Sequence, residues 1–436
     1  MKRTKLAALA CATASVALVA SACSSSSKST GSSASGNTTI TVWMMTDAKT
    51  GWNQAVTNAV ADFKKQHPGD NVNLQWKTWG TYLTQFAAAV KSGSVPDVME
   101  VGNTQAITPI AGGAFAELDS AISSGTFPNS SSWNAGLKAS CTMDGHVYCV
   151  PYYAADRMAG INPTQAAAVG ITSAPKTWTE FLADVQKLNT KYGSTKGYNG
   201  FELTGGSEYT GLAFVKDAGG VVAEQQGSTW KAELESTASE QGLANYCTLF
   251  KASKNNSATE TDDAQDPSWS NGTAGMMYGL AWEWNNPPAG FTGTSPTPAF
   301  YFNIPSPTTS GSYLPDFTGG SDLAVPSASK NQSLAESWIA DYTDSANEAI
   351  MAAAGDIPNA TNLMSDVSGT KNTQYASGQD NPFFVPTAKN WVKVDGGTPN
   401  LIDNLLESMT QNGCTASAID TAAKTADAAI DSALNG

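Results

Sequence analysis

The side chains best suited to binding a solute are aromatic and polar residues that follow predicted strands. Trp282 and Trp284 come after Ala274 to Tyr278, a run of small and apolar residues that predicts a strand. We expect at most one of the two indoles to face a cleft, and which of them does so is left open. A flat indole covers the apolar face of a sugar ring, whose hydroxyls need fixed acceptors or amides nearby. These residue types therefore predict a site for a neutral, hydroxyl-rich ligand.

Polar side chains follow two other predicted strands. Asp47 comes just after Ile40 to Met45, and Asn103 and Thr104 come just after Pro96 to Val101. Ligands of parallel α/β sheets collect at the carboxyl ends of the strands, so these residues are expected at one edge of a sheet. A solvated helix N-cap is the alternative role for Asp47. The predicted strand ends are Met45–Asp47, Trp76–Trp79 and Gly102–Gln105.

The sequence contains no recognisable arrangement of catalytic groups. G-x-S-x-G, H-E-x-x-H and P-loop patterns are absent, and none of the 38 acidic residues stands out as part of a pair for glycosidic cleavage. Zinc ligation is disfavoured because His67 and His146 are the only histidines and their spacing does not suit a tetrahedral site. We expect no enzymatic activity, no cofactor and no metal ion, and keep an exported glycan hydrolase as the alternative.

The elements that position these side chains alternate between strands and helices. From Ile40 to Ala111 a strand is followed by a helix three times, which predicts a parallel sheet with right-handed crossovers. A second region opens with a helix over Trp178–Leu188, preceded by a capping box from Thr177 to Glu180. About 400 residues beyond the leader exceed a comfortable single core, so two domains are expected.

The stretch from Asp144 to Pro163 is predicted to carry the chain between these domains, with the ligand beside the crossing. An Asp-Gly turn opens it, and alternating residues up to Tyr152 predict a strand that leaves a hairpin. Of the adjacent Tyr152 and Tyr153, one is expected to pack in the core, and we assign Tyr152 to the ligand. Arg157 follows and is expected to be a structural ion-pair partner.

Four cysteines remain beyond the leader, and they allow three pairings in an oxidising compartment. Cys141 and Cys149 flank the predicted turn, so hairpin geometry favours a bond between them. Cys247 and Cys414 then pair by elimination.

The first 22 residues predict export. Basic residues precede an apolar run of 15 residues, which is too short to span a bilayer, and small residues follow it. Removing Lys2, Arg3 and Lys5 changes the formal charge from −14 to −17 and leaves Arg157 as the only arginine. Such a surface repels nucleic acid and offers no basic cluster for phosphate.

Cys23 stands directly after the small residues, in a context that resembles a bacterial lipobox. In that motif a signal peptidase cuts before a cysteine that carries a diacylglyceryl group. The resemblance implies a lipoprotein whose Cys23 is modified, with palmitate among the acyl chains, and a Ser-rich linker that follows as a flexible tether. An ordinary secreted protein with an incidental cysteine is the alternative.

The order of six segments between about residues 39 and 436 resembles the extracellular solute-binding proteins of ABC sugar importers, family 1, the group that contains maltose-binding protein. The segments are ITVWMM, VPDVMEVGNTQAITPIAGGAFAELD, DGHVYCVPYYAADRMAGINP with PKTWTEF, NGTAGMMYGLAWEW, TGGSDLAVP and AAAGDIPNA.

This resemblance implies an α/β, two-lobed periplasmic-binding-protein-like fold of type II with three hinge crossings. The crossings would lie near Pro151–Tyr153, Pro305–Tyr313 and Pro358–Asn359. The implied divisions are a signal peptide at 1–22, the lipid-anchored linker at 23–38, lobe 1 at 39–151 plus 312–358, and lobe 2 at 152–311 plus 359–436.

The resemblance also implies roles for the candidate residues. A stacking tryptophan falls in the segment of Trp282 and Trp284, and a second one at Trp391. The remaining implied ligand contacts are the first-lobe polar groups Asp47, Asn103 and Thr104, the second-lobe pair Glu208 and Tyr209, and Gly319 and Gly320, which would let the backbone approach the ligand.

The function implied is capture of a neutral oligosaccharide, of two to four units, between the lobes. Hinge closure would then present the loaded protein to the permease subunits of an ABC transporter. The protein would be a monomer, held at the extracytoplasmic face of the bacterial cell membrane by the Cys23 lipid. Binding of a non-sugar solute is a further alternative.

Overall fold

The computed structural model describes residues 37–259, 268–269, 271–280, 301–317, 319–354, 356–366, 382–383, 385–397 and 399–436. The predicted signal segment, Cys23, Trp282 and Trp284 lie outside these described residues. Within them, no helix combines the length and apolar character needed to cross a bilayer.

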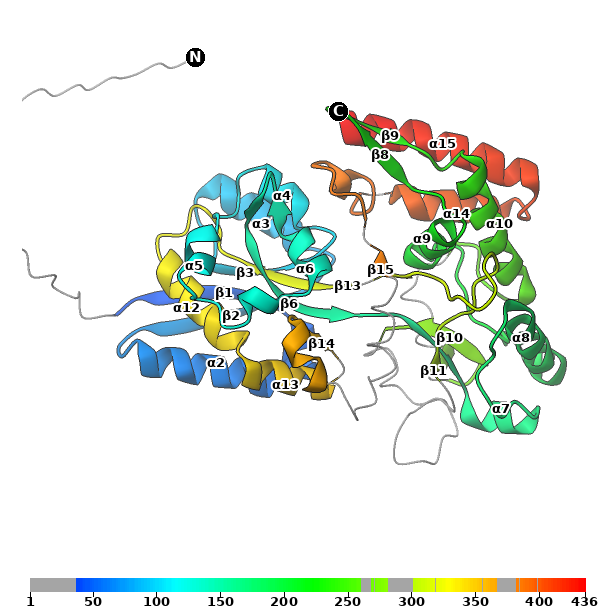
Figure 1. The fold of residues 1–436 in the computed structure, drawn as a ribbon, viewed down its shortest axis with the longest axis horizontal. Helices are drawn as coiled ribbons and strands as arrows, with labels where there is room; N and C mark the ends of the chain where they lie inside the picture. Colours follow the sequence, from blue (N-terminus) through cyan, green and yellow to red (C-terminus); the bar gives the residue numbers. More distant parts are fainter. Residues whose placement is uncertain are drawn as a thin grey trace, which may run out of the picture. The chain divides into compact units, whose positions relative to one another are not determined.

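A mixed six-stranded sheet organises the first of two α/β regions (Figure 1). In sheet order its strands are β14 (Ile357–Pro358), β6 (Cys149–Ala155), β13 (Gly319–Ala324), β3 (Val98–Gly102), β1 (Thr39–Met45) and β2 (Asn71–Lys77). The pairings of β1 with β2 and with β3 are parallel, which confirms the predicted parallel core. The strands β13, β6 and β14 join by antiparallel pairings, which the local sequence pattern did not reveal.

Amphipathic helices cover this sheet. They are α1 (Thr46–Gly51), α2 (Asn53–Gln66), α3 (Tyr82–Ser92), α4 (Ile107–Ala111), α5 (Asp119–Ser123), α6 (Ala135–Ser140), α12 (Gln332–Tyr342) and α13 (Ser345–Ala354). Figure 1 shows α2 beside α12 and α13, and residues of α2 contact both of these helices. Phe63 of α2 and Trp338 of α12 are fully buried in the resulting core. Burial of such large side chains stabilises the fold by roughly 1.5–3 kcal/mol each.

A smaller antiparallel sheet and five longer helices form the second region. Its elements are α7 (Pro163–Ala168), α8 (Trp178–Tyr192), α9 (Glu208–Asp217), β8 (Ala223–Gln226), β9 (Thr229–Ala232), α10 (Thr237–Ala252), α14 (Leu401–Gln411), α15 (Ala416–Asn435), and the sheet strands β10 (Met276–Gly279), β7 (Met158–Ile161) and β11 (Tyr301–Phe302). Gly242 allows α10 to approach α9 closely, because a Cβ atom there would lie 2.4 Å from the Phe214 carbonyl oxygen.

The predicted capping box opens α8. The Thr177 hydroxyl accepts a hydrogen bond from the Glu180 amide at 3.2 Å. The Glu180 carboxylate reaches back to the Lys176 amide at 2.7 Å, one residue before the cap. This local signal was sufficient to place the start of the helix correctly.

Several short elements complete the described part of the chain. They are the hairpin β4 (Thr142–Met143) with β5 (His146–Val147), the pair β12 (Asp316–Phe317) with β15 (Pro382–Phe383), and the 3₁₀ helices η1 (Ser130–Ser132), η4 (Thr361–Asp366) and η6 (Trp391–Lys393). After the hairpin the chain runs through β6 in the first sheet and enters β7 of the second sheet at Met158. Strand β14 has only two residues. It is extended because Ile357 and Pro358 pair with Ala154 and Tyr153 of β6.

The predicted lobe boundaries remain a prediction. Most residues of the predicted first lobe pack in the core around β1 and β3, but Leu314 and Phe317 pack in the second core. Ile107 of α4 also packs in that second core.

The structure bonds Cys141 to Cys149 across the β4–β5 hairpin and Cys247 of α10 to Cys414 at the turn before α15. The first bond closes a loop with a sequence separation of 8, and the second closes one of 167. The Cys141–Cys149 bond lies within the first core, and the Cys247–Cys414 bond lies within the second.

The two bonds should contribute unequally to stability. In the chain-entropy description, replacing Cys247 and Cys414 by serine lowers the free energy of unfolding by about 5 kcal/mol. The same replacement of Cys141 and Cys149 lowers it by about 2.5 kcal/mol, because the closed loop is much shorter. Urea denaturation of both double variants measures the difference, and an equal or reversed order would contradict this account.

Candidate ligand-binding site

The carboxyl ends of β1 and β2 bring an exposed indole and a carboxylate together. Asp47 lies in the first turn of α1, which begins directly where β1 ends. Its Oδ2 accepts a hydrogen bond of 2.6 Å from Nε1 of Trp79, which follows β2. The Trp79 side chain is 38% exposed and rests edge-on against Tyr82, with 5.5 Å between the ring centroids. Trp79 is therefore a fixed aromatic surface that is open to solvent.

The end of β3 completes this edge of the sheet. A Cβ atom at Gly102 would lie 3.4 Å from the Trp79 ring and 3.1 Å from Oε1 of Gln105, so both side chains lie over the glycine. The buried Tyr82 hydroxyl hydrogen-bonds Gln105 and accepts a 3.3 Å bond from the Gly102 amide. These contacts fix the position of Trp79 relative to the end of β3.

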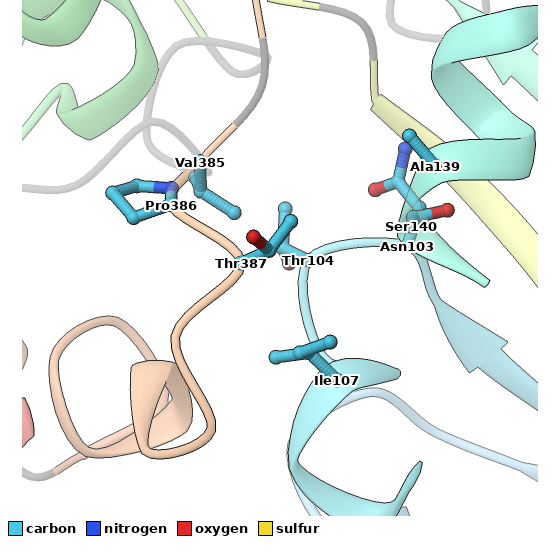
Figure 2. Close-up of a pocket in the computed structure, with 8 residues that line it drawn as sticks. All are labelled: Asn103, Thr104, Ile107, Ala139, Ser140, Val385, Pro386 and Thr387. Atoms are coloured by element: carbon cyan, nitrogen blue, oxygen red, sulfur yellow. The ribbon is translucent and has the colours of Figure 1, made fainter. Parts of the chain in front are cut away.

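Asn103 and Thr104 form the turn that follows β3 and line a small cavity. The backbone N–H of Asn103 donates a hydrogen bond to the Gly320 carbonyl at 3.1 Å, and Asn103 is almost entirely buried. The cavity, of about 40 Å³, is lined by Asn103, Thr104, Ile107, Ala139, Ser140, Val385, Pro386 and Thr387 (Figure 2). Figure 2 shows Val385–Thr387 approaching the turn that carries Thr104.

Further hydrogen bonds join the same two segments. The Thr108 hydroxyl donates to the Lys389 carbonyl at 2.9 Å, although 281 positions separate them in the sequence. Burial raises the pKa of Tyr209 and of Asp395, and a hydrogen bond with the Thr104 hydroxyl partly offsets each rise. The turn after β3 thus contacts the second region through the side chain of Thr104, and the nearby Thr108 adds a further contact.

Glu208 and Tyr209 open helix α9 near this turn. The Glu208 side chain is buried, and its Oε2 accepts a 2.8 Å hydrogen bond from Nδ2 of Asn400, the N-cap of α14. The Tyr209 ring stacks on Phe317, with 4.0 Å between centroids and 14° between planes, and the Arg157 guanidinium lies 5.6 Å from its centroid. Glu208 is therefore held in place by the N-cap of α14, and Tyr209 lies close to Thr104.

Buried carboxyl groups lie beneath the sheet edge. Glu100 on β3 is 1% exposed, and its Oε2 accepts a 2.7 Å hydrogen bond from the Met45 amide at the end of β1. Burial raises the pKa of Glu100 to about 8, and the nearby negative charge of Asp47 adds to the shift. Burial also raises the pKa of Asp356 and of Asp322 well above the ordinary value. With a pKa of about 8, Glu100 is mostly protonated at neutral pH, so its carboxyl group can donate as well as accept hydrogen bonds.

Three predicted ligand residues need correction. Tyr152 has no exposed surface, because its ring packs against Trp52 and Tyr342 and its hydroxyl hydrogen-bonds both. Trp391 is also fully buried, and its indole N–H donates to Asp395 at 2.9 Å, so it is a core residue.

Gly320 permits a close approach, but to another strand. Its φ is +146°, and a Cβ atom there would lie only 2.1 Å from the Tyr153 carbonyl oxygen of β6. Gly319, at the start of β13, is partly exposed and would accept a Cβ atom without a close contact.

Arg157 is buried beside Asp316, and the ion pair expected from the sequence stays a prediction. It is 5% exposed, its amide donates to Oδ1 of Asp316 at 3.0 Å, and its positive charge partly offsets the rise in the pKa of Asp316 caused by burial. It links the chain after β6 to β12.

Among the described residues, two groups of three side chains have metal-ligating atoms within reach of one another. One contains the bonded Cys141 and Cys149, and the other contains the solvent-facing Glu117, Asp119 and His146. In the second group Asp119 already accepts hydrogen bonds from the Val147 amide and from His146. These contacts form a polar cap on the hairpin.

Comparison with known proteins identifies relatives across most of the chain. The family described as bacterial extracellular solute-binding protein matches residues 45–349. The diacetylchitobiose binding protein DasA of Streptomyces coelicolor is 28% identical over 424 residues, covering 94% of this chain and 94% of that protein.

Two solved structures show the same fold. The sugar-binding protein MalE of Xanthomonas citri superimposes with a TM-score of 0.73 at 18% identity, covering 91% of this chain and 97% of that one. UgpB of Mycobacterium tuberculosis, solved in complex with glycerophosphocholine, also gives a TM-score of 0.73 at 18% identity, covering 91% and 99%. These matches confirm the predicted two-lobed α/β fold class.

The buried acid Glu100 should make stability depend on pH. Its folded pKa of about 8 lies above the ordinary value of 4.5, so the folded state holds a proton that the unfolded state releases between these pH values. The contribution of Glu100 to stability is therefore fully present below pH 4.5 and decreases, by at most about 5 kcal/mol, as pH rises through about 8.

The variant Glu100→Gln keeps an acceptor for the Met45 amide and cannot ionise. Relative to the wild-type protein, it should gain free energy of unfolding from pH 5 to pH 8 in denaturant titrations. Glu224→Gln, which changes an exposed carboxylate on β8, is the matched control and should show no comparable trend. A Glu100→Gln difference that stays constant over this range would contradict the assignment.

Proposed function

This chain belongs to the family of bacterial extracellular solute-binding proteins, and we propose that its solute is a neutral oligosaccharide of two to four units. The observation that carries the proposal is the exposed Trp79 indole, held by Asp47 at the sheet edge where α/β proteins bind ligands. Asn103 and Thr104 supply amide and hydroxyl groups beside it, and the lining of the adjacent cavity includes no basic residue. An aromatic platform with neutral polar groups suits a sugar ring.

The kinship with DasA supports a sugar ligand. That relative is named for binding diacetylchitobiose and covers nearly all of this chain. An N-acetylated disaccharide is therefore among the first ligands to test. The ligand contacts that we propose are Trp79, Asp47, Asn103, Thr104, Glu208, Tyr209 and Gly319, with Trp282 and Trp284 retained from the sequence.

The mechanism that we propose is hinge closure between two lobes, at 39–151 plus 312–358 and at 152–311 plus 359–436. The contacts between the crossings support it. Pro358 pairs with Tyr153, and Nδ2 of Asn359 donates to the Pro151 carbonyl at 2.9 Å, so the first and third crossings are adjacent. At the second crossing, the Ser306 amide bonds to the Ser312 carbonyl at 2.9 Å. A ligand that contacts both lobes shifts the population toward the closed form, which then docks on the permease subunits of an ABC importer.

The location that we propose is the extracytoplasmic face of the bacterial cell membrane. An export signal at 1–22 and a lipid on Cys23 would anchor the protein through the Ser-rich linker, and the monomer would act alone. The Cys141–Cys149 and Cys247–Cys414 bonds suit an oxidising compartment.

Anchoring can be tested in the producing cell. Cys23→Ala should abolish incorporation of labelled palmitate and release the protein into the medium. Substitution of Cys11, which lies within the signal segment, is the matched control and should leave both unchanged. Retention of the label in Cys23→Ala would show that the lipid is attached to another residue.

Two other functions remain to be separated from this one. UgpB shows that the same fold can hold glycerophosphocholine, so a non-sugar solute is the first alternative, and an exported glycan hydrolase is the second. Calorimetric titration with di-, tri- and tetrasaccharides, glycerophosphocholine, amino acids and polyamines tests the first. Saturable sugar binding with unchanged ligand supports the proposal. Binding only of a non-sugar solute, or turnover of the sugar, would overturn it.

Trp79 should be a major contact of the ligand. Trp79→Ala removes the exposed indole and should weaken sugar binding at least tenfold, since stacking and burial of such a ring contribute about 1.5–3 kcal/mol. Trp79→Phe keeps a ring but loses the hydrogen bond to Asp47, so its affinity should be intermediate.

The control for these variants is Val90→Ala. Val90 is 43% exposed on α3, so its substitution removes an exposed apolar side chain without touching the site. The affinity of Val90→Ala should equal that of the wild-type protein. Equal affinity of Trp79→Ala would exclude Trp79 as a platform.

A further inference from the structure

The small cavity beside Thr104 has a shape and lining that specify one chemical group. Its volume of about 40 Å³ corresponds to about three water-sized positions. This space is far too small for a sugar ring and suits a short substituent that projects from one. The cavity lies directly against the turn after β3, whose residues we propose as sugar contacts.

Apolar side chains supply much of the lining. Ile107 and Ala139 contribute from one side, and Val385 and Pro386 contribute from the other. Figure 2 shows Ile107 and Val385 on different segments that approach the same space. A hydroxyl group placed here would lose hydration against carbon atoms, whereas a methyl group would be favoured.

Polar groups stand at the rim of this apolar space. The side-chain amide of Asn103 can both donate and accept hydrogen bonds, and the hydroxyls of Thr104 and Thr387 lie across from it. The Ser140 hydroxyl is already used, since it donates to the Leu137 carbonyl at 2.7 Å and lies 3.1 Å from Asp322 Oδ2. The cavity thus combines room for one methyl group with polar side chains at its rim.

We propose that this cavity receives the acetamido group of a 2-acetamido sugar. The methyl group packs between Ile107, Ala139 and Val385, and the amide N–H and C=O face Asn103 and Thr387. This inference rests on the proposed function, because it requires that the cleft binds a sugar. It names the class of that sugar and assigns the residues that select it.

The position of the cavity gives the acetamido group a second effect. Its two walls belong to segments 103–107 with 139–140 and to segment 385–387, which also meet through the Thr108–Lys389 hydrogen bond. A group that fills the space contacts both walls at once. The acetamido sugar therefore favours the arrangement in which these segments lie together.

The test compares matched sugars by calorimetric titration of the wild-type protein. The ligands are β-1,4-linked, β-1,3-linked and α-1,4-linked disaccharides, each with C2 acetamido groups and with C2 hydroxyls. The best acetamido sugar should bind about tenfold more tightly than its hydroxyl counterpart, from burial of one methyl and one satisfied amide.

Ala139→Leu should fill the cavity and bring this affinity ratio close to one. Ala139 is exposed on α6, so the substitution leaves the core intact. Ala135→Leu is the matched control, because Ala135 is exposed on the same helix outside the lining, and its ratio should equal that of the wild-type protein. Ile107→Ala, which removes apolar wall, should also lower the ratio.

The outcomes distinguish failure of the acetamido assignment from failure of the proposed oligosaccharide function. Sugar binding with a ratio near one, or in favour of hydroxyl sugars, overturns the acetamido assignment and leaves the oligosaccharide function intact. A preference for acetamido sugars that survives in Ala139→Leu places the acetamido group elsewhere and overturns the cavity assignment. Binding of no sugar from this set or from the wider panel overturns the proposed function itself.

Discussion

The rest of the structure depends on how β6 crosses from one core to the other with its backbone satisfied. Every residue of this strand is buried, and it pairs with β13 on one edge and with β14 on the other. Pro151 cannot donate to a ladder, and the register of β13 shifts beside it, between Ser321 and Asp322. The Pro151 carbonyl is satisfied by the Asn359 side chain instead. A bulge and one side-chain amide thus allow a proline inside a central strand.

The same crossing explains several buried acids. Glu100, Asp322 and Asp356 lie around β6 and its partners, where burial raises the pKa of each. The raised pKa has a common cause, because burial penalises the charged form of each carboxyl group. Around this crossing the acids act as hydrogen-bonding groups, and the charge that Asp47 presents lies at the sheet edge, beside Trp79.

Sequence patterns predicted the elements whose causes are local. The parallel strands β1 to β3 and the cap of α8 follow from periodicity and end signals within a few residues. Strand β14 could not be predicted, because two residues become a strand only by pairing with β6. Tyr152 and Trp391 were misassigned for a related reason. An aromatic side chain near a strand end has the same local pattern whether it packs inward or faces solvent, and only tertiary contacts decide.

The site was predictable on one side only. Asp47, Asn103 and Thr104 follow strands of one parallel sheet, so chain order alone indicated their shared edge. Trp79 had the same signal, since it ends the predicted stretch after β2, and the structure adds its exposure and its hydrogen bond. Val385–Thr387 carry no such signal, because they are distant from the turn after β3 in the sequence. The nearby Thr108–Lys389 hydrogen bond, for example, joins residues that are 281 positions apart.

The two sides of the candidate site would contribute differently to ligand affinity and to closure of the lobes. Trp79 and Asp47 belong to one sheet edge, so a ligand contacts them equally well whether or not the second segment is near. Such contacts add affinity without shifting a conformational equilibrium, because only interactions that differ between two states can shift it. The Thr104 contacts with Tyr209 and Asp395, and the cavity closed by Val385–Thr387, exist only when both segments meet. Under the proposed function, selectivity and closure would therefore reside in the same small set of residues, at the turn after β3.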